Sequence, residues 1–143
     1  KNTTALCLYA RIEAEQLQNY EAAKTYFQEA LAINIDAVAV YPYYLETLLL
    51  NEDYEDASKL IDFALTIKGI NKMAILLKKV HLLERQQDIK GAIQLMKEVK
   101  LASFANDTYE IDEVEKRLKA KKDLLKPKKK SKKKKSEKKG KKK

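Results

Sequence analysis

Apolar residues recur along most of this chain at the spacing of an amphipathic α-helix. Ala23, Phe27, Ala30 and Leu31, for example, stand at positions i, i+4, i+7 and i+8, which form one stripe of a helix. Short polar stretches separate one such pattern from the next. The patterns predict an all-α chain whose helices cover residues 4–18, 20–34, 37–50, 54–68, 72–86, 88–103 and 108–125.

The second of these patterns returns 34 residues later. The stretch YEAAKTYFQEALAI at residues 20–33 becomes YEDASKLIDFALTI at residues 54–67. A weaker copy follows about 35 residues further on, with Ile89, Ala92, Met96 and Val99. Self-similarity at a fixed period of this length indicates a repeat protein, in which each helix pair buries its apolar face on its neighbours.

Each copy resembles the second helix of a tetratricopeptide repeat, which is a 34-residue helix–turn–helix unit. That family has a tyrosine, an alanine, a large apolar residue and a second alanine where Tyr20, Ala23, Phe27 and Ala30 stand. The resemblance covers about residues 4–106. It implies an α–α superhelix, or solenoid, whose concave groove binds other proteins rather than catalysing a reaction. The period itself is also compatible with other repeats of paired helices.

The helix pattern and the resemblance together divide the chain into parts. Three repeats are expected at about residues 4–36, 37–71 and 72–106, a capping helix at 107–125 and a disordered lysine-rich tail at 126–143. The third repeat departs most from the family pattern, because Lys79 stands where a bulky apolar residue is usual. Pro42 fits only the first turn of a helix, so the third helix is predicted to begin near Val40 or to bend.

The positive charge of the chain is concentrated at one end. The formal net charge is +9, but residues 126–143, KPKKKSKKKKSEKKGKKK, hold 13 lysines and one glutamate and so carry +12. The remaining residues 1–125 therefore carry −3 and are mildly acidic. The tail has no apolar residue with which to offset the entropy of ordering, so we expect it to be disordered.

Residues able to carry catalysis are sparse. The chain has one histidine, His81, one cysteine, Cys7, and three glycines that form no phosphate-binding loop. Neither a nucleophile–base pair nor metal-ligand spacing is visible, so we expect no enzyme activity, no cofactor and no metal site. Cys7 lies on an apolar helix face and is best interpreted as a small buried hydrophobe. No apolar run is long enough to span a bilayer.

The chain starts with Lys1 and shows no signal-peptide pattern. We interpret it as part of a longer protein or larger assembly, because its first repeat has no covering helix on the N-terminal side. Residues 127–135 resemble a short basic nuclear-import signal, although any lysine run satisfies that pattern. A cytoplasmic or nuclear location is therefore favoured.

The resemblance implies a groove lined by exposed residues of the first helix of each repeat. It places there Arg11, Glu15, Glu46, Leu49, Leu50, Leu77, His81, Glu84 and Arg85, with Cys7, Ala14 and Pro42 beside them. This mixture of charge around an apolar centre suits a partner peptide or helix. The alternative is that Leu49 and Leu50 pack on adjacent helices. A clamp for acidic chaperone C-termini is not expected, because only Arg11 is plainly cationic among the positions that would form it.

The tail is the second candidate binding element. Its polyanion-binding residues are expected to include Lys128, Lys129, Lys130, Lys132, Lys133, Lys134, Lys135, Lys138 and Lys139. Lysine binds phosphate as a point charge and reads no base, so RNA, DNA, an anionic membrane and an acidic protein are all chemically suitable partners.

Three functions are compatible with these features. The first is a non-catalytic scaffold or adaptor that binds a partner protein in the groove and attaches to a polyanion through the tail. The second is an RNA- or DNA-associated subunit in which the tail is the main binding element. The third is a structural segment of a larger helical-repeat protein. Removing the tail would abolish binding only in the second case.

Overall fold

The described part of the chain folds entirely into α-helices. The computed structural model describes residues 2–102 and 108–125, and every regular element within them is a helix. The helices are α1 (Thr3–Glu15), α2 (Tyr20–Ile33), α3 (Val40–Leu50), α4 (Tyr54–Ala64), α5 (Lys72–Arg85), α6 (Ile89–Ala102) and α7 (Thr108–Leu125). The predicted all-α class is confirmed.

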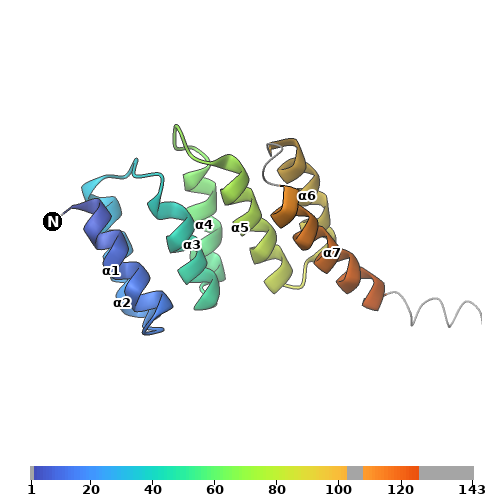
Figure 1. The fold of residues 1–143 in the computed structure, drawn as a ribbon, viewed down its shortest axis with the longest axis horizontal. Helices are drawn as coiled ribbons and strands as arrows, with labels where there is room; N and C mark the ends of the chain where they lie inside the picture. Colours follow the sequence, from blue (N-terminus) through green and yellow to red (C-terminus); the bar gives the residue numbers. More distant parts are fainter. Residues whose placement is uncertain (1, 103–107, 126–143) are drawn as a thin grey trace, which may run out of the picture.

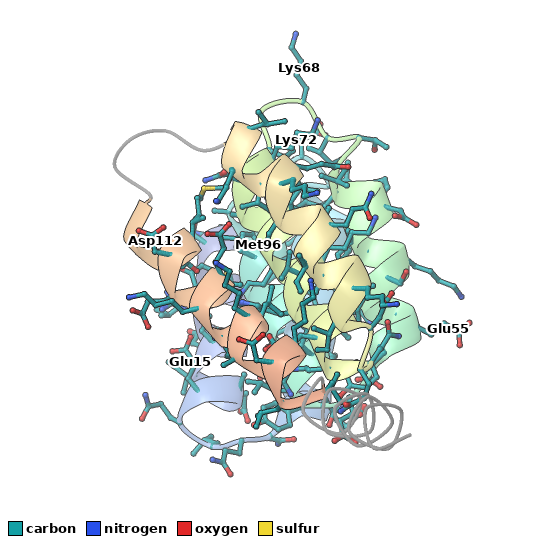
Figure 2. The ribbon with its side chains drawn as sticks, turned by 90° about the vertical axis from the view of Figure 1, so that its right-hand side faces the viewer. Glu15, Glu55, Lys68, Lys72, Met96 and Asp112 are labelled. Atoms are coloured by element: carbon teal, nitrogen blue, oxygen red, sulfur yellow. The ribbon has the colours of Figure 1, made fainter. Side chains whose placement is uncertain are left out.

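The helices pack in the order of the chain. The pairs α1–α2, α3–α4 and α5–α6 are in contact, and α7 packs on α6. Successive pairs touch through α2 and α3 and through α4 and α5, and the first helices α1, α3 and α5 also contact one another in turn. Figure 1 shows an elongated row with α1 and α2 at one end and α6 and α7 at the other. Figure 2 looks along this row, with Met96 of α6 and Asp112 of α7 in front.

A residue in the left-handed backbone region joins the two helices of each pair. Gln18, Glu52 and Gln87 have φ angles of 53°, 60° and 67°, and successive members lie 34 and 35 residues apart. The next residue begins the second helix: the Asn19 and Asp88 side chains accept hydrogen bonds from the backbone N–H three residues on, at 3.4 and 2.9 Å. The backbone conformation of the turns therefore repeats with nearly the same period as the apolar residues.

Two helices end three or four residues before the position that the sequence predicts. α1 ends at Glu15 rather than at residue 18, and α4 ends at Ala64 rather than at residue 68. After α4 the chain tightens, because the N–H groups of Thr66 and Ile67 bond to carbonyls three residues back. Gly69 then adopts a φ of 86°. This tighter path places the Ile67 side chain in the core.

Pro42 lies in the first turn of α3, because that helix begins at Val40. The predicted late start is thus confirmed. The N–H groups of the first turn have no acceptor within the helix, so a proline there removes no helical hydrogen bond.

The core consists of two clusters that meet on α5. The first cluster joins α1 to α4 and includes Ile75 and Leu82 of α5. The second joins α5, α6 and α7 and includes Leu76, Leu77 and Val80 of α5. Different faces of α5 therefore pack against different neighbouring helices. Each large apolar side chain buried in this way stabilises the fold by about 1.5–3 kcal/mol.

Candidate protein-binding groove

A cavity of about 560 Å³ opens between α3, α5 and α7. We call it the central groove, and the residues around it are Glu46, Leu49, Tyr54, His81, Glu84, Arg85, Gln87, Arg117 and Lys121. Its walls form because α3 and α5, the first helices of successive pairs, lie side by side and α7 packs beyond them. Most of these side chains are polar or charged, so the groove suits polar groups of a ligand.

Glu84 is the centre of an ion-pair network across the groove. Arg117 donates two hydrogen bonds to its carboxylate, from Nε to Oε2 at 2.8 Å and from Nη2 to Oε1 at 3.0 Å, and Lys121 Nζ lies 2.6 Å from Oε2. Only 8% of the Glu84 side chain is exposed. Lys78 Nζ lies 2.6 Å from Glu46 Oε2 and connects α5 to α3 in a similar way. Charged hydrogen bonds thus fix the relative positions of all three walls.

The cations keep both carboxylates ionised. Burial would raise the pKa of Glu84, but the hydrogen bonds from Arg117 and Lys121 outweigh it and lower this pKa below its ordinary value. Burial likewise opposes ionisation of Glu46, and Lys78 is the main cause of the lowered pKa of that carboxyl. Both glutamates are therefore negative at neutral pH.

His81 lies in the wall between these ion pairs. Burial, followed by the positive charges of Lys78 and Arg117, lowers the pKa of its imidazole. The carboxylates of Glu46 and Glu84 oppose this shift without reversing it. The Nε2 atom is buried and has no hydrogen-bond partner within the described part of the chain. His81 is therefore neutral at pH 7, and its Nε2 atom is enclosed in the wall of the groove.

The groove carries a surplus of positive charge. Among the residues that line it, Arg85, Arg117 and Lys121 stand against the carboxylates of Glu46 and Glu84, which gives +1 with His81 neutral. Arg85 is exposed and forms no ion pair with the described residues, although its charge acts on Glu46. Such a surplus attracts anions, and a guanidinium can bind a carboxylate through two hydrogen bonds.

The structure brings together some of the residues predicted for the groove. Those that line the central groove are Glu46, Leu49, His81, Glu84 and Arg85. Leu50 is exposed on α3 but lies outside the lining. The part of the prediction centred on α3 and α5 therefore corresponds to a real cavity.

The expectation of exposure is wrong for several residues. The structure buries Ala14, Leu49, Leu77 and Glu84. It also buries Cys7, as the interpretation of this residue as a small hydrophobe expected. Leu77 is covered because Ile111, Val114 and Leu118 of α7 pack in the same cluster. Leu49 packs in the first core cluster, as the alternative interpretation expected. Glu84 is enclosed by its two cationic partners.

Arg11 and Glu15 lie on α1, away from the central groove. Arg11 Nε is 3.3 Å from Glu15 Oε1, and its guanidinium lies over the Tyr43 ring at 4.1 Å from the centroid. Arg11 lines a separate cavity of about 490 Å³, together with Leu8 and Val38. The groove predicted from the resemblance is therefore divided between two places.

Sequence reasoning does not identify Arg117 and Lys121 as groove residues. Their i, i+4 spacing places them on one face of α7, but it does not show which helix that face meets. Tyr54 and Gln87 are missed because they lie at the ends of elements and not on first helices. The predicted polyanion-binding lysines, within residues 126–143, lie outside the described residues.

No protein-family model matches the chain, and no curated protein matches its sequence. Across residues 2–102 and 108–125, none of the helices combines the length and the apolar character needed to cross a membrane. The same residues contain no group of three or more His, Cys, Asp or Glu side chains that could hold a metal ion. The fold and the central groove are therefore the basis for a functional proposal.

Proposed function

We propose that this chain is a non-catalytic scaffold whose central groove binds an acidic segment of a partner protein. The observation that carries the proposal is the positive surplus around Arg85, Arg117 and Lys121 in a cavity of about 560 Å³. Ligand sites typically have volumes of about 300–1,000 Å³. The groove can therefore accommodate several side chains of a bound peptide or helix.

The proposed architecture is a tetratricopeptide-type superhelix. Its support is the 34-residue period, the pairing of successive helices, and the left-handed turns at Gln18, Glu52 and Gln87. In this arrangement the groove supplies specificity. The lysine tail raises the local concentration of the scaffold near a polyanion.

Matched peptides test the groove. The full chain is titrated at near-physiological salt with a fluorescent peptide rich in Asp and Glu, and with the same peptide carrying Asn and Gln instead. The acidic peptide is expected to bind roughly tenfold or more tightly, and Arg85→Glu should remove that advantage, which is about 1.4 kcal/mol. Lys59→Glu makes the same charge change at an exposed position on α4 and should have little effect.

If Arg85→Glu leaves the binding of the acidic peptide unchanged, the proposal that the central groove binds this peptide is rejected. The lysines of the tail also attract acidic peptides, so the titration is repeated with a chain that ends at Leu125. Binding that persists in this shorter chain and remains sensitive to Arg85→Glu belongs to the groove.

The lysine distribution favours a second candidate function. Residues 126–143 carry +12, so the chain would be an RNA- or DNA-associated subunit with the tail as its main binding element. Neutralising about 6–10 phosphates would reduce affinity by about 10³–10⁵ between about 50 and 200 mM salt. In that case, removing the tail abolishes nucleic-acid binding and Arg85→Glu leaves it intact.

A third candidate is a structural segment of a larger helical-repeat protein. It is favoured by the apolar side chains that α1 exposes, Leu8, Tyr9 and Ile12. This function needs neither the groove nor the tail to bind a ligand.

A further inference from the structure

One face of α1 is apolar and exposed. Tyr9 is 54% exposed and Ile12 is 42% exposed, with the half-buried Ala5 beside them at helical spacing. We call Ala5, Tyr9 and Ile12 the outer face of α1. Figure 1 shows α1 and α2 at the end of the row of helices. The Tyr9 ring touches only one other ring among the described residues, that of Tyr26, with centroids 6.0 Å apart.

Equivalent positions in the other first helices are defined by the turns. The backbone N–H that follows each left-handed residue bonds to the carbonyl of Glu13, Leu48 and Leu83, respectively. These acceptors are 35 residues apart, so each residue of α1 corresponds to the residue 35 positions later in α3 and 70 positions later in α5.

Most counterparts of the outer face are buried in α3 and α5. Ile12 corresponds to Thr47 and Leu82, which are 2% and 4% exposed. Tyr9 corresponds to Tyr44, which is 8% exposed, and to Lys79, which is half-buried. The counterparts of Ala5 are Val40 and Ile75, which are also buried. The face has the same position in each first helix, but only in α1 does it lack a cover among the described residues.

In α3 and α5 these positions face the preceding helix pair. The Tyr44 ring stacks on Phe27 of α2, with centroids 5.3 Å apart and an interplanar angle of 12°. Gln28 Nε2 of the same helix donates a hydrogen bond to Tyr44 Oη at 3.2 Å. Ile75 and Leu82 of α5 pack in the core cluster that contains the α4 side chains.

We propose that the outer face of α1 docks the second helix of another helix pair, in the way that α2 packs on α3. The chemistry of the occupant follows from α2, whose buried stripe of Ala23, Phe27 and Ala30 combines small residues with one aromatic ring. Small residues allow close approach of the helices, and the ring stacks on Tyr9 as Phe27 stacks on Tyr44. The docked helix continues the interface already present between successive pairs.

A second copy of this chain does not supply such a helix. Phe27 of α2 and Ile61 of α4 are buried in their own core, and Met96 of α6 packs in the cluster that α7 completes. The stripe of each second helix is therefore already occupied. The outer face of α1 is also separate from the central groove, so the inference does not depend on peptide binding there.

The test extends the full chain with a copy of residues 2–36 placed ahead of Asn2, so that a copied α2 precedes α1 at the spacing that separates α2 from α3. Hydrogen exchange of the original α1 amides is followed by mass spectrometry. Exchange should slow by roughly tenfold or more relative to the unextended chain. Ile12→Glu and Ala5→Arg in the original α1 should each remove most of this protection, because the counterparts of both positions in α3 and α5 are buried. Leu124→Glu, at a position 78% exposed on α7, is the control and should leave it intact.

Unchanged exchange of α1 in the extended chain would overturn the proposal. Protection that persists in both the Ile12→Glu and the Ala5→Arg variants would also overturn it, and two variants are used so that a folding defect in one does not decide the result. Sedimentation of the unextended chain tests the alternative that a second copy of this chain covers the outer face of α1. A dimer that Ile12→Glu dissociates would assign the face to a second copy and reject the proposed helix pair.

Discussion

Arg117 of α7 binds the carboxylate of Glu84 on α5 through two hydrogen bonds, 2.8 and 3.0 Å long. The two residues are 33 positions apart in the chain, and their pairing holds the last described helix against the central groove. Lys121 adds a second cation to the same carboxylate. The ion pairs that α7 forms with α5 therefore converge on a single acidic side chain.

Glu84→Gln should reduce the free energy of unfolding by about 1–3 kcal/mol, because the negative charge is lost and one of the two acceptor oxygens is replaced by an NH2 donor that faces Arg117 and Lys121. Urea denaturation at neutral pH measures the change. Glu55→Gln is the matched control, since Glu55 and Lys59 form an exposed pair on α4 worth about 0–1 kcal/mol. Equal effects of the two substitutions would contradict the structural role of Glu84.

The stability of the fold should fall as the pH drops below about 4.5. The pKa values of Glu46 and Glu84 lie below the ordinary value of 4.5, so the unfolded chain takes up protons before the folded one does. The stabilisation is complete above the ordinary pKa and is lost as the pH falls through the folded-state values. Urea unfolding at a series of pH values down to about 3 follows this loss.

The double variant Glu46→Gln/Glu84→Gln is the comparison for that series and should show a shallower dependence on pH. Protonation of His81 also lowers the stability of the fold as the pH drops below about 6.5, because the pKa of its imidazole is lowered in the folded state. The two chains are therefore compared at each pH. Parallel curves for the parent and the double variant would assign the acid sensitivity to other carboxylates.

Glycine at the left-handed turns should stabilise the protein. In the left-handed region a residue with a side chain is destabilised by about 1–2 kcal/mol. Glycine avoids this strain, but it loses more conformational entropy on folding, which offsets part of the gain. Gln18→Gly, Glu52→Gly and Gln87→Gly should thus each raise the free energy of unfolding by about 0.5–1 kcal/mol. Gly69→Ala is the reverse control: its φ is 86° and an added Cβ would contact nothing within 4 Å, so any loss comes from the backbone alone. Destabilisation by all three glycines would contradict this account.

Gly91→Ala should lack the stabilisation that alanine usually gives inside a helix. Asp88 Oδ1 accepts the Gly91 N–H at 2.9 Å, and a Cβ at this position would collide with Asp88 Oδ2. Alanine would normally stabilise the helix by about 1 kcal/mol relative to glycine. Here the Asp88 side chain must move and its capping hydrogen bond is lost, which costs a similar amount. In an Asp88→Ala background the same substitution should stabilise by about 1 kcal/mol. A double-mutant cycle measures the difference, and additive effects would show that Asp88 does not restrict this position.

Helix pairing was predictable because its signals are local. The stripe of Ala23, Phe27 and Ala30 and the capping residue Asn19 lie within one helix, and α2 matches its predicted span to within one residue. The end of α4 was not predictable from such signals. It depends on the i to i−3 bonds of Thr66 and Ile67, which place Ile67 in a core formed by distant residues.

The groove was predictable only in part, for a related reason. Glu46, His81 and Arg85 lie on first helices, whose shared orientation follows from the repeat. Arg117 lies on α7, and no pattern in the sequence of α7 predicts which helix its charged face will contact. The burial of Leu77 has the same origin, because α7 covers the face of α5 on which it lies.

The sharing of α5 between two core clusters has a mechanical consequence. Ile75 and Leu82 join it to one side of the row, and Leu76, Leu77 and Val80 join it to the other, so tension applied across the molecule passes through this helix. Because the row is held together by contacts between adjacent helices and helix pairs, the pairs would separate one after another under load, and the molecule would lengthen in steps.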